Sequence, residues 1–184
     1  MRKIVSYFLI IFFIAILVFF YNRNDSFDSI DDALLGNSWE DVEIGNIIYK
    51  DTNEEGVFVM FSFTKTLKST KWLGIAFIIG NENDGWKLDN SSFRSYGYDI
   101  NNSTLTSSHY IYFMDDKSKI EVTYGQIIDP QINYIEVANY SNKKFEKIDI
   151  IESISGRYYF YKEDVAVRGL SKDNNVVIKI PSSF

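Results

Sequence analysis

The chain has no cysteine, one histidine and only two prolines among its 184 residues. Without cysteine it can form neither a disulfide nor a lipid-acylated anchor, and with a single histidine the usual zinc sites cannot be assembled. The sequence also lacks the phosphate-binding glycine loop, the G-x-G-x-x-G dinucleotide motif and the G-x-S-x-G nucleophile motif. It therefore predicts no cofactor and no metal, and it identifies no catalytic residue.

Basic residues are in the minority. The chain has 19 Lys and Arg against 25 Asp and Glu, which gives a formal net charge of -6. An acidic surface repels the phosphate backbone of DNA and RNA. We therefore expect no nucleic-acid partner.

One long apolar run stands at the N-terminus. Residues 4–21 read IVSYFLIIFFIAILVFFY and contain no charged residue, no glycine and no proline. As a helix rising about 1.5 Å per residue, this run extends roughly 27 Å, close to the thickness of a bilayer's hydrocarbon core. The run predicts a transmembrane helix over residues 4–21.

The flanks of the run favour an uncleaved signal anchor. A cleaved signal peptide is the alternative, but the small-x-small pattern of a cleavage site is missing after the run. Arg2 and Lys3 precede the run and only Arg23 directly follows it, so the positive-inside tendency places the N-terminus inside. The expected layout is a cytoplasmic tail (1–3), a span (4–21), a linker with a short helix (22–36) and an extracytoplasmic β domain (37–184). The expected location is the cell membrane, single-pass, with the C-terminal domain outside.

A short amphipathic helix is expected over Ser26 to Leu35. Ser26 or Asp28 can cap its start and Gly36 can end it. Apolar residues spaced three and four apart share one face, namely Phe27, Ile30 and Leu34. This face would seat the linker on the domain.

From Ile44 onward the hydrophobic period changes to two, and β-branched and aromatic residues become frequent. Turn residues separate the segments, and Asp84-Gly85 is a typical hairpin signal. The predicted strands are 44–51, 57–64, 72–79, 86–88, 107–114, 119–128, 132–140, 145–151, 157–162, 165–170 and 176–180. This pattern predicts a mostly-β fold, a sandwich or partly closed barrel of about ten strands.

Residues 90–102 form the longest stretch without a clear period, and they are rich in Ser, Asn and Tyr. Functional residues are often carried by loops of this kind. Exposed tyrosine offers large contact area with a polar tip. The candidate partner-binding residues are therefore Phe93, Arg94, Tyr96 and Tyr98.

Other residues with chemical potential have structural interpretations. His109 shares a strand face with Ile111 and Phe113, and it is interpreted as a hydrogen-bonded strand residue. Residues 81–85 and 173–175 resemble calcium loops but miss the EF-hand pattern, so they are interpreted as hairpin tips. Four pairs of adjacent carboxylates are interpreted as solvated turn residues, namely Asp31/Asp32, Glu54/Glu55, Asp115/Asp116 and Glu163/Asp164.

Five short stretches together resemble small membrane-anchored or secreted proteins of Bacillus and relatives. They are GVFVMF (56–61), LGIAF (73–77), DGWK (84–87), YGQIID (124–129) and VRGLSKD (167–173). The resemblance covers most of the chain after the apolar run. It implies an outer location and a β-rich domain, and it transfers no catalytic residue.

These observations favour a membrane-tethered, extracytoplasmic, non-catalytic β domain that binds a protein, peptide, glycan or other cell-envelope component. A carboxylate-dependent envelope hydrolase is one alternative, and it would need two acidic side chains facing each other across a cleft. A purely structural spacer or assembly factor is another.

Overall fold

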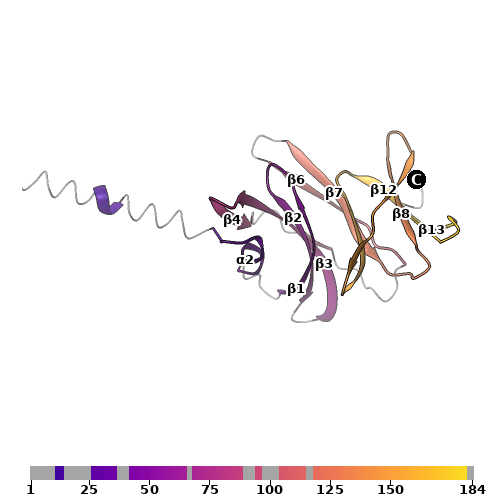
Figure 1. Ribbon diagram of the computed structural model, residues 1–184, viewed down its shortest axis with the longest axis horizontal. Coiled ribbons are helices and arrows are strands. Elements are labelled where there is room, and N and C mark those ends of the chain that lie inside the picture. The colour runs from indigo at the N-terminus through magenta and orange to yellow at the C-terminus, as the bar shows by residue number, and fades with distance from the viewer. Residues whose placement is uncertain are drawn as a thin grey trace, which may run out of the picture.

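The computed structural model describes residues 11–14, 26–36, 42–65, 68–88, 94–96, 104–114 and 118–181, without the side chains of 68–70 and 94–96. Thirteen strands in this part of the chain form three antiparallel sheets. The sheets follow one another along the molecule, with β6 and β7 between the N-terminal strands and the C-terminal strands (Figure 1). The mostly-β prediction is confirmed.

The N-terminal sheet has the order β1-β2-β3-β4, with β5 also paired to β3. Its strands are β1 (Val42–Thr52), β2 (Val57–Lys65), β3 (Lys68–Asn81), β4 (Gly85–Leu88) and β5 (Arg94–Tyr96). The predicted hairpin between β3 and β4 is present. Gly85 adopts φ +83° there, a conformation that side chains other than glycine rarely accept.

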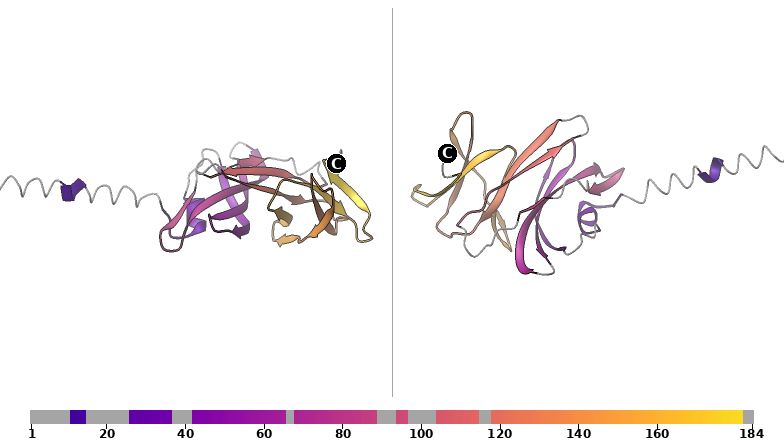
Figure 2. Two further views of the ribbon diagram at one scale, coloured as in Figure 1. Left: turned by 90° about the horizontal axis from the view of Figure 1, so that it is seen from above. Right: turned by 180° about the vertical axis from the view of Figure 1, so that it is seen from behind.

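The central sheet has the order β10-β11-β7-β6, and the C-terminal sheet has the order β13-β12-β8-β9. The central strands are β6 (Ser108–Phe113), β7 (Lys119–Ile127), β10 (Ile151–Ser153) and β11 (Gly156–Tyr161). The C-terminal strands are β8 (Tyr134–Asn139), β9 (Phe145–Ile148), β12 (Val165–Leu170) and β13 (Val176–Ile180). Figure 2 shows the C-terminal sheet at the end of the molecule opposite α2 (Ile30–Leu35).

The central sheet contributes to two separate cores because both of its faces are apolar. Tyr158 and Phe160 on β11 pack toward the N-terminal sheet, in a core that includes Phe58 and Phe77. Tyr159, the residue between them, is fully buried in the second core, against the C-terminal sheet. Successive side chains of a strand point to opposite faces, so one run of aromatic residues supplies both layers.

A third core lies on the outer face of the N-terminal sheet, where α2 covers it. The helix begins after Ser29, whose hydroxyl oxygen accepts a hydrogen bond from the Asp32 backbone N–H at 3.0 Å. Leu34 is fully buried, and Phe27 and Ile30 pack beside it, as the sequence predicts. The N-cap is Ser29, one position after Asp28 and three positions after Ser26, so both predicted caps are wrong. The helix is also shorter than predicted.

The prediction of a transmembrane helix over residues 4–21 is contradicted. Within the described residues, none of the helical segments combines the length and the apolar character that a bilayer crossing requires. The described part of this run, residues 11–14, is one helical turn, about 6 Å long, and the other residues of the run lie outside the described part. The predictions of a single-pass topology, a signal anchor and a location at a cell membrane depended on this helix, and the same finding contradicts them.

Three further sequence predictions differ from the structure. The strands form three sheets in layers, instead of one two-sheet sandwich or partly closed barrel. The predicted strand over 145–151 is divided between β9 and β10, which belong to different sheets. Residues 94–96, predicted as loop, form β5 beside β3.

Candidate functional site

One transverse row of the central sheet contacts the C-terminal sheet. The strand register aligns His109 on β6, Thr123 on β7 and Tyr161 on β11. Nδ1 of His109 lies 3.8 Å from a carboxylate oxygen of Asp164, beyond hydrogen-bond distance. The buried Thr123 hydroxyl donates to the backbone carbonyl of Glu163 at 2.7 Å. The turn between β11 and β12 therefore closes over this row.

Two tyrosines near the contact between this row and the C-terminal sheet, Tyr161 and Tyr140, have raised pKa values. The Tyr161 hydroxyl donates to a carboxylate oxygen of Glu146 at 2.6 Å. This hydrogen bond, together with burial and the negative charges of Glu146 and Glu163, raises the pKa of Tyr161 to about 12. Burial and the neighbouring Asp164 carboxylate raise the pKa of Tyr140. Both phenols are therefore neutral at ordinary pH. The negative charge around them comes from the carboxylates of Glu146, Glu163 and Asp164.

Beyond the row the central sheet narrows to two strands, because β11 ends there while β6 and β7 continue. The face of this hairpin that points away from the N-terminal sheet carries two register pairs. We call its four residues the β6 ledge: Ile111 opposite Glu121, and Phe113 opposite Lys119. The ammonium group of Lys119 and the carboxylate of Glu121 lie 2.6 Å apart, so the polar half of the ledge is internally paired.

The apolar half of the ledge is exposed, although the opposite face of the same strand belongs to a core. Phe113 is 66% exposed and Ile111 is 37% exposed. Tyr110 and Tyr112 on the opposite face are buried, and the Tyr112 ring centroid lies 4.3 Å from that of Phe77. An antiparallel pair with one buried face normally presents polar residues to solvent. Ile111 and Phe113 depart from this pattern, because they place two large apolar side chains next to each other on the open face.

The four residues that the sequence singled out lie elsewhere. Phe93 and Tyr98 are outside the described residues, and so are the side chains of Arg94 and Tyr96. The backbone of Arg94 pairs with Ile75, and that of Tyr96 pairs with Leu73. β5 thus lies beside β3 in the N-terminal sheet, and the prediction that these residues bind a partner remains a prediction.

His109 does not form a catalytic triad with Thr123, the hydroxyl residue that is its partner in the strand register. The Thr123 hydroxyl donates to Glu163 O and also accepts a hydrogen bond from the Val165 backbone N–H at 3.2 Å. It is buried and engaged on both sides. The predicted hydrogen bond of the His109 imidazole is not found among the described residues, where Nε2 is shielded from solvent and without a partner.

The carboxylate pairs serve different neighbours. Asp31 pairs with Lys50 on β1, while Asp32 accepts a hydrogen bond from the Ser29 hydroxyl at 2.6 Å. Glu163 accepts from the Asn139 side-chain amide at 2.9 Å, and Asp164 faces His109. Glu54 and Glu55 are exposed in the turn between β1 and β2, and Asp115 and Asp116 lie outside the described residues. In the described part of the chain no group of acidic or histidine residues is arranged to hold a metal ion.

Both segments that resemble calcium loops are turns. The side-chain oxygen of Asn81 accepts from the backbone N–H groups of Asn83 and Asp84, which closes the β3–β4 hairpin. Asn174 adopts φ +61° between β12 and β13, and its N–H donates to Ser171 O at 2.9 Å. These oxygen and nitrogen atoms close the turns, as the hairpin interpretation requires.

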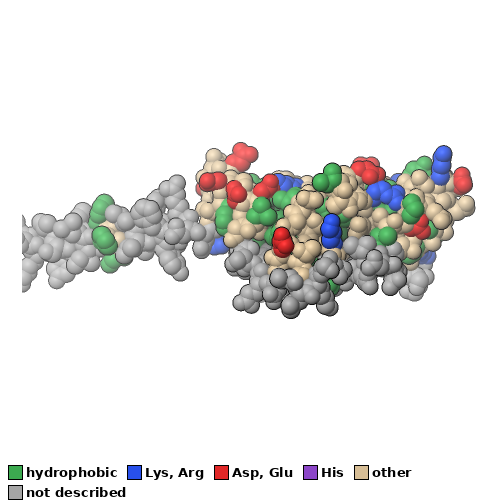
Figure 3. All heavy atoms as spheres, turned by 90° about the horizontal axis from the view of Figure 1, so that it is seen from below, with side chains coloured by type: hydrophobic (Ala, Val, Ile, Leu, Met, Phe, Trp, Pro, Cys, Tyr) green, Lys and Arg blue, Asp and Glu red, His purple; other side chains and the backbone are tan. Residues whose placement is uncertain are grey.

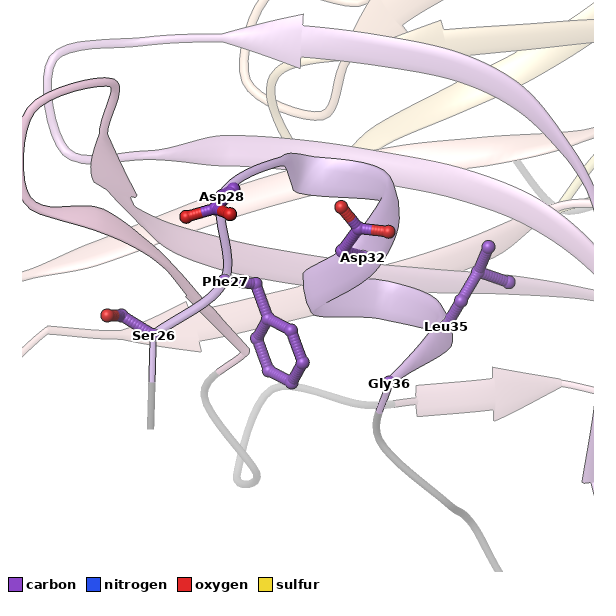
Figure 4. A pocket seen from close by; sticks show the side chains of 6 residues that line it. All are labelled: Ser26, Phe27, Asp28, Asp32, Leu35 and Gly36. Carbon is purple, nitrogen blue, oxygen red and sulfur yellow. The ribbon is translucent and has the colours of Figure 1, made fainter. Parts of the chain in front are cut away.

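An open hollow of about 550 Å³ lies beside α2, lined by Ser26, Phe27, Asp28, Asp32, Leu35 and Gly36 (Figure 4). Its floor is the Phe27 ring, which packs so closely on Gly36 that an added Cβ there would lie 2.4 Å from a ring carbon. Acidic side chains gather at this end of the domain (Figure 3). Asp32 is bonded to Ser29 at the start of the helix, and the backbone of Phe27 pairs with that of Trp86 on β4, so these groups of the hollow hold the helix turn and attach it to the sheet.

The sequence gives an ambiguous signal for the ledge. Residues 108–113 place large side chains on both faces of the strand. β2 and β11 do the same, and both of their faces are largely covered. The alternation indicates a strand that is apolar on two sides. It does not indicate that the face carrying Ile111 is open, because that depends on how far the C-terminal sheet extends over the central sheet.

No protein-family model matches this chain, and neither a curated protein nor a solved structure matches it.

Proposed function

We propose that this domain is a non-catalytic binding module that takes up an apolar segment of a partner protein on the β6 ledge. The observation that carries the proposal is the exposure of Phe113 and Ile111 side by side on a strand whose other face is buried. A partner that covers these two side chains removes apolar surface from water without having to break a contact of the fold.

The gain is appreciable. The exposed parts of these two side chains amount to roughly 200 Å² of apolar surface, which corresponds to about 5 kcal/mol when a partner covers them completely. Association costs offset much of this gain, so contacts around the ledge also have to contribute. The ledge supports weak to moderate binding of a short segment.

A non-catalytic role is supported by the state of the polar groups nearby. Lys119 is paired with Glu121, and Thr123 is engaged by the turn before β12. General acid–base chemistry needs a group within hydrogen-bond reach of a reacting atom and near a suitable nucleophile. Lys119, Glu121 and Thr123 are instead engaged in contacts within the domain.

The test is selection from a random dodecapeptide display library on the full-length protein. Peptides that survive selection are then measured against a double variant, Ile111→Thr with Phe113→Thr, in which threonine preserves β propensity. Val176→Thr on β13 is the matched control, since Val176 is also an exposed apolar strand residue. We expect the double variant to weaken binding about tenfold or more, and the control to leave it unchanged.

Two results would overturn the proposal. One is a selection that enriches no peptide over a bare surface. The other is enriched peptides that bind the double variant as well as they bind the unaltered protein.

A further inference from the structure

We infer that the segment bound at the β6 ledge carries a basic side chain beside its apolar ones, and that the Asp164 carboxylate receives it. The inference rests on the binding role proposed above. It assigns a chemical class to the partner: an apolar segment with one lysine or arginine at a fixed spacing from the residue that covers Ile111.

The first support is the charge at the edge of the ledge. The Asp164 side chain is 43% exposed, and its nearest cation-forming neighbour among the described residues is His109, at 3.8 Å. Lys162, two positions earlier in the chain, is engaged 2.7 Å from Asp51 on β1. In the described part of the chain no lysine or arginine forms an ion pair with Asp164.

The second support is that the surrounding groups add negative charge or none. Glu163 is bonded to the neutral side chain of Asn139, so its charge is not compensated there. Tyr140, next to Asp164, is a neutral phenol. The one described cation on the ledge, Lys119, is already paired with Glu121. A cationic group entering here meets an uncompensated carboxylate at an apolar border, where charge pairs are stronger than in open solvent.

The third support is geometric. His109, Ile111 and Phe113 lie on one face of β6 at a spacing of two residues, about 7 Å apart along the strand. Asp164 lies beside His109, one such step from Ile111. A bound segment that places apolar side chains over Phe113 and Ile111 therefore brings its next side chain to Asp164. A lysine or arginine has the length to reach that carboxylate from above the ledge.

The library selection described above also tests this inference, through the composition of the enriched peptides. We expect an excess of lysine and arginine over the starting library on the unaltered protein. Selection on Asp164→Asn should lose this excess while retaining the apolar preference. Asp173→Asn, in the exposed turn before β13, is the matched charge control and should retain both.

Three blocked heptapeptides provide a direct measurement: Thr-Val-Thr-Val-Thr-Lys-Thr and its analogues with Gln or Glu in place of Lys. In each, one strand face carries Val, Val and then the variable residue, in the order Phe113, Ile111 and Asp164. We expect the Lys peptide to bind the unaltered protein about fivefold more tightly than the Gln peptide, as an exposed ion pair allows, and the Glu peptide to bind most weakly. On Asp164→Asn the difference between Lys and Gln should disappear.

The outcomes separate the two proposals. Apolar peptides that bind through Ile111 and Phe113 with no preference for a basic residue would overturn this inference and leave the binding role intact. A basic preference that persists in Asp164→Asn would also overturn it. A selection that yields no binder at all would overturn the binding role, and this inference with it.

Discussion

At the scale of single residues, Tyr161 offers the clearest electrostatic prediction. Its hydroxyl is bonded to Glu146, and its pKa is raised to about 12. A tyrosine in an unfolded chain titrates near 10. Because the folded-state pKa is the higher one, Tyr161 contributes stability that is fully present below about pH 10 and is lost as the pH rises toward 12.

We expect Tyr161→Phe to remove one phenolate transition near pH 12 from the ultraviolet absorption titration of the folded protein. Glu146→Gln should shift that transition to lower pH, because the glutamine side chain carries no negative charge. Loss of a transition near pH 10 instead of near pH 12 in Tyr161→Phe, or an unchanged titration in Glu146→Gln, would show that the hydrogen bond between these two side chains is not formed.

A second prediction at this scale concerns the fully buried Tyr159. Its hydroxyl donates to Thr106 O at 2.7 Å, and both residues are buried. Tyr159→Phe leaves that carbonyl without this donor, so we expect a loss of about 1–2 kcal/mol in the free energy of unfolding. Tyr134→Phe, at a half-exposed tyrosine on β8, is the control and should change the unfolding free energy by less than about 0.5 kcal/mol. Urea unfolding measures both, and equal effects would contradict the assignment.

At the scale of elements, β6 has two apolar faces with different roles. Tyr112 packs on Phe77 in the core, whereas Ile111 and Phe113 lie on the open ledge. We expect Tyr112→Ala to lower the unfolding free energy by about 3 kcal/mol. The double variant Ile111→Thr with Phe113→Thr should stay within about 0.5 kcal/mol per site of the unaltered protein.

Chemical denaturation of these variants separates function from structure. A large destabilisation by the ledge variant would mean that Ile111 and Phe113 stabilise the fold, and their exposure would then carry no functional argument. Retained stability with lost peptide binding is the combination that the binding role requires.

Much of the element structure could be predicted from the sequence, because strand periodicity is local. The alternation in β2 predicts a strand buried on both faces, and residues 57–61 are buried without interruption. The aromatic run in β11 predicts rings on both faces, and the two faces serve two cores. Asp84-Gly85 predicts the β3–β4 hairpin because glycine accepts the positive φ.

Other features depend on contacts between distant residues and could not be predicted. Ile148 and Ile151 belong to one apolar pattern, yet they lie in different sheets because the chain crosses between layers at residues 149–150. β5 forms because its backbone meets the free side of β3, which no property of residues 94–96 indicates. The exposed ledge likewise depends on where the C-terminal sheet lies over the central sheet, and that contact is made by the turn before β12 (Val165–Leu170), far along the chain from Ile111.

At the scale of the whole molecule, the layered order predicts cooperative unfolding. The central sheet supplies side chains to both inter-sheet cores, so loss of one core removes support from the other. Trp72 and Trp86 both pack in the outer core of the N-terminal sheet, far along the chain from the C-terminal sheet. In a Trp39→Phe background, tryptophan fluorescence therefore reports on the N-terminal sheet, while circular dichroism reports on all strands.

We expect Val167→Ala, in the core shared with the C-terminal sheet, to lower stability by about 2 kcal/mol. The fluorescence and circular dichroism midpoints should shift together, as two-state unfolding requires. A fluorescence midpoint that stays fixed while part of the circular dichroism signal is lost earlier would show that the two cores unfold independently.

The apolar run at residues 4–21 shows how composition and whole-molecule structure can disagree. Its hydropathy predicts a membrane span, but the described helices are too short for one. The residues of the ledge, in contrast, lie on described strands, and their exposure does not depend on where the protein is located.

The most direct test of the binding role is a two-dimensional amide NMR titration of the full-length protein with the dodecapeptide most enriched by selection. We expect the largest shift changes at β6 (Ser108–Phe113), at Lys119 to Glu121 on β7 and at Asp164. The same titration of the Ile111→Thr, Phe113→Thr variant should show no such changes. Changes confined to the hollow beside α2 or to the C-terminal sheet, with β6 unaffected, would contradict the account.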